Sequence, residues 1–146
     1  MSTAPISKIL APVDLSSCSR AALEFACKLA QPFGAHIEVL FVRPLSGVTP
    51  SGEAPKSKDD ELSAARAELH RFVTSIPGTQ PGALTERVES GDAQEEIIRA
   101  AEKGAFDAIV LGTHGRTGRA RSLAGSVAES TVRRAACPVI TVREPR

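Results

Sequence analysis

Five short apolar runs alternate along the chain with longer amphipathic stretches, and this alternation restricts the fold more than any other feature. The apolar runs, which we expect to be strands, lie at residues 8–14, 36–42, 84–89, 107–111 and 138–142. Helices are expected between them, at 16–33, 59–76, 92–104 and 126–136. Strands that alternate with helices form a parallel sheet with helices on both faces. We therefore expect an α/β protein with one doubly wound, mostly parallel five-stranded sheet.

Residue types that favour helix ends support these boundaries. Ser16 can cap the first expected helix, and Gly34 suits its end. Asp92 stands three residues before a glutamate, and so does Ser126, which is the pattern of a capping box. Residues 84–89 are more polar than the other runs, which favours a strand at the edge of the sheet.

Length and charge limit the classes of protein that fit. The 146 residues suit a single domain over 1–146, with a long loop at about 43–58 that is rich in Pro, Gly and Ser. The net charge of +1 and the lack of Trp and Tyr argue against nucleic acid as a partner. No apolar window is long enough to span a membrane.

The chain start and the cysteines bear on the cellular compartment. Residues 1–14 lack the basic start and continuous apolar stretch of a signal peptide. Cys18, Cys27 and Cys137 are odd in number and lack the spacing of metal ligands. We expect reduced thiols in a cytoplasmic protein.

The segment from Gly112 to Ser126 carries the strongest functional signal. It leaves an expected buried strand and enters an expected helix. Gly112 and Gly115 allow the backbone to approach a ligand closely. At Gly125 and Ser126, the unpaired N–H groups of a helix start favour an anion. Three arginines, at positions 116, 119 and 121, add positive charge to the same segment.

Two interpretations of this segment stay open from the residues alone. The first is phosphate binding; the second is that the glycines serve packing and that Ser126, with Glu129, only caps its helix. Neither the GxGxxG nor the GxxxxGK[ST] fingerprint is present. His114 has no carboxylate or nucleophile spaced to orient it, so we expect it to contact backbone or phosphate, and we identify no catalytic residue.

The spacing Gly112-x2-Gly115-x9-Gly125-Ser126 resembles the G-2x-G-9x-G-[ST] pattern of the ATP-binding branch of the universal stress protein family. Residues 8–16, 39–42 and 137–142 resemble the first, second and last strands of that family. The resemblance implies an adenine nucleotide alpha hydrolase-like fold with strand order 3-2-1-4-5. Ligands of such sheets bind outside the carboxyl ends of the strands, at the point where the strand order reverses.

The resemblance also implies which residues bind the nucleotide. Those on the adenine and ribose side are Pro12, Val13, Asp14 and Val42. Those around the ribose and phosphates are Gly112, Gly115, Arg116, Gly125, Ser126 and Val127. The phosphates, with few protein ligands, would hold Mg²⁺ or Mn²⁺. For Asp14 the alternative is to cap the following helix, and for Val42 it is core packing.

The function that this resemblance implies is ATP binding in a stress-response regulator with little or slow hydrolysis. Two alternatives use the same fold: an adaptor for an unknown protein partner, and a slow ATPase or phosphotransferase. The last strand, Val139–Val142, would be a sheet edge with unpaired backbone groups. Pairing with a second copy would cover it, and the resemblance also implies a homodimer.

Overall fold

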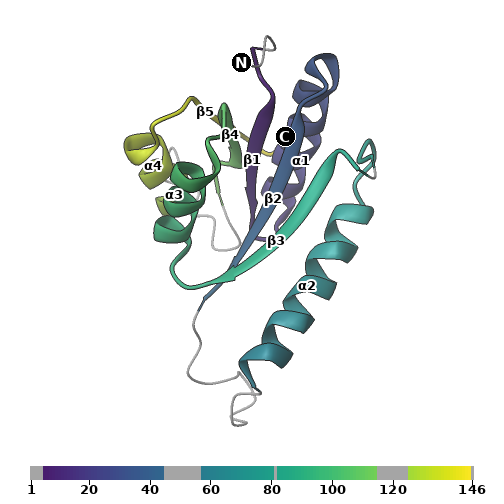
Figure 1. Ribbon diagram of the computed structural model, residues 1–146, viewed down its shortest axis with the longest axis vertical. Coiled ribbons are helices and arrows are strands. Elements are labelled where there is room, and N and C mark those ends of the chain that lie inside the picture. The colour runs from purple at the N-terminus through teal and green to yellow at the C-terminus, as the bar shows by residue number, and fades with distance from the viewer. Residues whose placement is uncertain (1–4, 45–56, 81, 115–124, 146) are drawn as a thin grey trace.

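The computed structural model describes residues 5–44, 57–80, 82–114 and 125–145, which form one twisted sheet with helices on both faces (Figure 1). The strands are β1 (Lys8–Val13), β2 (His36–Arg43), β3 (Leu84–Ser90), β4 (Ala108–Gly112) and β5 (Val139–Val142). The helices are α1 (Ser17–Ala30), α2 (Lys58–Thr74), α3 (Ala93–Gly104) and α4 (Ser126–Arg134), with a short 3-10 turn, η1 (Gln31–Phe33). None of the described helices has the length and apolar character to cross a membrane.

The five strands are all parallel and lie in the order β3-β2-β1-β4-β5. The expected fold class and strand order are both confirmed. The order reverses between β1 and β4, where Leu10 pairs with Ile109. Continuing this register by three residues places Val13 level with Gly112, so the two strands end side by side.

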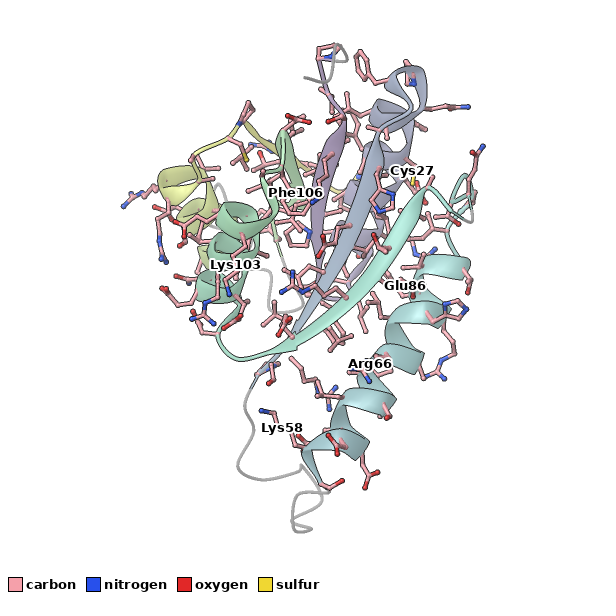
Figure 2. All side chains as sticks on the ribbon, viewed as in Figure 1. Cys27, Lys58, Arg66, Glu86, Lys103 and Phe106 are labelled. Carbon is pink, nitrogen blue, oxygen red and sulfur yellow. The ribbon has the colours of Figure 1, made fainter. Side chains whose placement is uncertain are left out.

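Alternating residues of the strands divide the core into two clusters, one on each face of the sheet. On β1, Ile9 faces the cluster formed with α1 and α2, whereas Leu10 faces the cluster formed with α3 and α4. Phe106 lies in the second cluster, and Figure 2 shows it between α3 and the sheet. Because both faces of the central strands are covered, their sequences are almost continuously apolar.

Several helix ends differ from expectation. The first helix leaves α-helical geometry at Ala30, continues as η1 and stops at Gly34, which has a φ of 63°. Asp92 caps α3 through the amide of Glu95, as the capping-box pattern predicts. The expected cap at Ser126 is wrong: the N-cap of α4 is Gly125. Of the expected 43–58 loop, Arg43 belongs to β2 and Lys58 to α2, and residues 45–56 lie outside the described residues.

Asp107, immediately before β4, holds the start of β1. Its carboxylate accepts hydrogen bonds from the amides of Ser7 (2.8 Å) and Lys8 (3.0 Å) and from the hydroxyl of Ser7 (2.9 Å). These donors favour the ionised form, so they lower the pKa of Asp107 below its ordinary value of 3.8.

A pH titration of stability tests this contact. Because the pKa of Asp107 is lower in the folded state, its contribution is complete at neutral pH and is lost as the pH falls from about 5 through the folded pKa. We expect the melting temperature of the wild type to fall more steeply on acidification than that of Asp107→Asn. Parallel curves for the two proteins would show that the carboxylate adds no acid sensitivity.

Candidate functional site

The carboxyl ends of β1 and β4 bring the first predicted site residues together. Asp14 follows β1 directly, and Gly112 closes β4 at the level of Val13. Val42 lies one residue beyond Phe41, the β2 partner of Val13. Pro12, Val13 and Val42 therefore lie near the carboxyl ends of the neighbouring strands β1 and β2, and Asp14 follows β1 where the strand order reverses.

Asp14 shapes the start of α1. Its Oδ1 accepts a hydrogen bond from the amide of Ser16 at 3.0 Å, and its own amide donates to the hydroxyl of Ser19. Ser16, the N-cap, in turn accepts from the amide of Ser19. Asp14 is therefore not the N-cap of α1 but holds the amide of Ser16, the residue that caps it.

Gly112 is required by packing. A Cβ on this residue would lie 2.8 Å from the sulfur of Cys18 and 3.0 Å from the backbone carbonyl carbon and oxygen of Cys18. The N-terminal turn of α1 therefore rests directly on the backbone of β4. The packing interpretation holds for this glycine, and its contact with a ligand stays a prediction.

Gly125 allows the start of α4 to lie against the end of β4. Its amide donates to the carbonyl of Thr113, and a Cβ would lie only 2.9 Å from that carbonyl oxygen and 3.6 Å from the Cα of His114. A larger residue would separate the two segments. Thr113, before the segment 115–124, and Gly125, after it, are thus in direct contact.

The N-terminus of α4 differs from the other helix starts. Ser16, Ser57 and Asp92 each cap their helix with a side-chain oxygen. Among the four α-helices of the described chain, α4 is the one whose N-cap makes no side-chain hydrogen bond. The first amides of a helix need acceptors and carry partial positive charge. This end is therefore the helix start best suited to an anionic ligand.

Ser126 and Glu129 do not form the expected capping box. Ser126 is the first residue of α4 rather than its cap, and its side chain is exposed. The carboxylate of Glu129 pairs instead with Arg133, at 2.8 Å. Ser126 thus does not act as the N-cap of α4.

The predicted apolar residues lie on both faces of the sheet. Val42 is buried in the cluster shared by α3 and α4, and Val127 packs against the same cluster. Val13 is buried on the opposite face, and Pro12 is also buried. Core packing is therefore confirmed for Val42. Gly115 and Arg116 lie outside the described residues.

Thr113 is a site residue that the glycine pattern did not reveal. Only 4% of its surface is exposed, although it is polar. Its amide donates to the carbonyl of Val142 at 3.0 Å, and its hydroxyl lies 3.0 Å from Nδ1 of His114. In the sequence, Thr113 occupies the first of the two positions between Gly112 and Gly115, where the glycine pattern accepts any residue type.

Within the described residues, no group of three or more His, Cys, Asp or Glu side chains could hold a metal ion. Cys18 is buried, and its sulfur lies 3.4 Å from the carbonyl oxygen of Val142. This thiol packs between α1 and the sheet and is part of the buried core.

Fold and site together define a doubly wound α/β protein in which the start of α4 lies against the end of β4, beside the point where the strand order reverses. The chain belongs to the universal stress protein family, whose model matches residues 5–143. One relative, Universal stress protein MJ0531 of Methanocaldococcus jannaschii, is 32% identical over 142 residues, which cover 95% of this chain and 83% of the relative.

Solved structures show the same fold. Universal stress protein UspA from Lactobacillus plantarum has a TM-score of 0.79 at 28% identity, covering 94% of this chain and 98% of that one. The Archaeoglobus fulgidus universal stress protein in complex with dAMP has a TM-score of 0.66 at 24% identity, covering 94% and 97%. An Arabidopsis thaliana family member with AMP bound has a TM-score of 0.65 at 17% identity, covering 95% and 92%.

Proposed function

We propose that this protein binds ATP at the carboxyl ends of β1 and β4 and acts as a nucleotide-dependent regulator in the stress response. The observation that carries the proposal is the start of α4, where the N-cap is Gly125 and no side-chain cap is present within the described residues. Membership of the universal stress protein family and the adenine nucleotides named for two similar structures support it.

The proposal gives each part of the site a role. The amides of Ser126 and Val127, with the Ser126 hydroxyl, bind the phosphates, while the amide of Gly125 stays on the carbonyl of Thr113. Gly112, Gly115 and Gly125 lie along the ribose and phosphates. Arg116 adds positive charge. Both the position and the chemistry fit a phosphate, since helix N-termini bind such anions through amides and dipole.

Pro12, Val13, Asp14 and Val42 form the adenine and ribose side of the proposed site. Asp14 is half-buried, and one of its carboxylate oxygens holds the amide of Ser16. In this proposal the carboxylate of Asp14 accepts a hydroxyl of the ribose.

We propose Mg²⁺ or Mn²⁺ as the companion ion, held mainly by the phosphates. We also propose little or slow hydrolysis, because the segment 112–126 contains no Asp or Glu that would orient an attacking water. A cytoplasmic location fits the three cysteines, which are free thiols in the structure.

The matched serines of α4 test the site. Ser126→Ala should weaken ATP binding roughly tenfold or more, because a hydrogen bond to a charged group contributes about 1.5–3 kcal/mol. Its stability should change by less than about 0.5 kcal/mol, since Ser126 is exposed and does not cap α4. Ser130→Ala, about one turn further along the helix, is the control.

Isothermal titration with ATP and Mg²⁺ provides the measurement. Equal affinities for the wild type, Ser126→Ala and Ser130→Ala would place the phosphates elsewhere. A wild type that takes up neither ATP, ADP nor AMP would remove the proposed function.

We further propose a homodimer through the free edge of β5. The amides of Ile109 and Thr113 donate to Pro138 and Val142, so alternate residues of β5 face β4. Val139 and Thr141 therefore direct their N–H and C=O groups away from the sheet. Two copies related by a two-fold axis at Ile140 could pair these groups in antiparallel fashion.

Apolar side chains flank this edge on both faces. Phe25, 42% exposed, follows Cys18 by two turns of α1 and lies on the same side, toward β5. On α4, Arg134 reaches Glu95 of α3, and Val132, 55% exposed, lies about 200° around the helix, away from α3. Two exposed apolar residues beside an open strand edge favour a second copy as the partner.

Thr141→Pro tests the dimer. Proline removes an outward N–H while leaving the hydrogen bonds between β5 and β4 in place. Light scattering at micromolar concentration should give a dimer for the wild type and for Thr141→Val, and a monomer for Thr141→Pro. A monomeric wild type would rule out this interface.

A further inference from the structure

Thr113 joins the proposed nucleotide site to the free edge of the sheet. Its carbonyl accepts the amide of Gly125, the N-cap of α4, and its amide donates to the carbonyl of Val142, the last residue of β5. Both peptide groups that flank this one buried residue are thus hydrogen-bonded, one to each region. The conformation of Thr113 cannot change without loss of one of these contacts.

The carbonyl of Val142 is held from a second direction. The thiol of Cys18 donates to it at 3.4 Å, and the same sulfur lies 3.9 Å from the hydroxyl of Thr113. Gly112 pairs with Val142 in the sheet register and packs against Cys18. The end of β5 is therefore held by Cys18 and by Thr113, and Thr113 also contacts the start of α4.

Thr141, whose N–H faces the free edge, precedes Val142 directly. A change at Thr113 that moves Val142 also moves the outward groups that a second copy would bind. A ligand bound at the start of α4 would therefore act next to Thr113, the residue that also holds the end of β5.

We propose that nucleotide binding at the start of α4 and pairing of β5 with a second copy are thermodynamically linked through Thr113. The inference rests on the proposed function. Because each dimer holds two equivalent sites, linkage requires that saturating nucleotide tighten the dimer by the square of the factor by which dimerisation tightens each site. Couplings of this kind are typically about 5–150-fold, and we expect at least about fivefold.

Two independent constants test the linkage. Sedimentation equilibrium gives the dimer dissociation constant of the wild type with and without saturating ATP and Mg²⁺, and it should fall at least about fivefold with nucleotide. Titration calorimetry of Thr141→Pro and Thr141→Val gives the nucleotide affinity of the monomer and the dimer. The monomeric variant should bind ATP more weakly, by the square root of the factor found for the dimer constant.

Ser126→Ala supplies the control, since its dimer constant should respond to nucleotide only at concentrations roughly tenfold or more above those that the wild type requires. If Thr141→Pro fails to fold, nucleotide affinity measured over a dilution series of the wild type replaces it. A wild type that dimerises and binds ATP with independent constants overturns the linkage alone. A wild type that binds no nucleotide overturns the proposed function as well, and one that stays monomeric with ATP overturns both the linkage and the interface.

Discussion

Gly112→Ala is expected to lower the free energy of unfolding by roughly 1–3 kcal/mol, the usual cost of forcing a methyl group into a packed core. The new Cβ would meet both the sulfur and the backbone carbonyl of Cys18. That backbone has little freedom to move, because Asp14, Ser16 and Ser19 fix the first turn of α1. Urea denaturation of the wild type and variant measures the change.

The double variant Gly112→Ala with Cys18→Ala separates the two contacts. Removing the sulfur relieves the 2.8 Å contact but leaves the two backbone contacts at 3.0 Å. We therefore expect the second substitution not to restore stability. Full recovery would show that the side chain alone, and not the backbone of α1, limits position 112.

Gly125→Ala is expected to weaken ATP binding on the order of 100-fold, about 2.7 kcal/mol. The added Cβ, 2.9 Å from the carbonyl oxygen of Thr113, would push the start of α4 away and displace several phosphate-binding amides together. This effect should exceed that of Ser126→Ala, which removes one hydroxyl. Stability should also fall, unlike in the serine variant.

Gly125→Ser distinguishes tertiary contact from helix capping. Serine is among the preferred N-cap residues, so capping alone would make this variant at least as stable as the wild type. The contact with Thr113 predicts the opposite, because serine carries the same Cβ as alanine. Thermal melts decide between them, and a rise in melting temperature for Gly125→Ser would contradict our account of this glycine.

The element types and the two-sided core follow from the sequence because each central strand is buried on both faces and each helix is amphipathic. Periodicity does not determine which strands are neighbours. The order of the strands followed instead from the resemblance carried by Gly112, Gly115, Gly125 and Ser126.

The parts of the site that the sequence missed depend on contacts between distant segments. Ser126 and Glu129 have the spacing of a capping box, which is a local sequence rule. In the structure, however, the N-cap is Gly125, whose amide donates to Thr113. Likewise, spacing identified Gly112 as special but could not reveal that Cys18, 94 residues earlier in the chain, occupies the space beside it. Such tertiary contacts have no signature within a short window of sequence.

The central claim is that the uncapped start of α4 binds the phosphates of an adenine nucleotide. The most direct test is a ¹⁵N-labelled NMR titration of the wild type with ATP and Mg²⁺. We predict that the amides of Gly125, Ser126 and Val127 shift most, together with those of Thr113 and Asp14. Shifts confined to other parts of the chain, or a spectrum unchanged at millimolar ATP, would contradict the account.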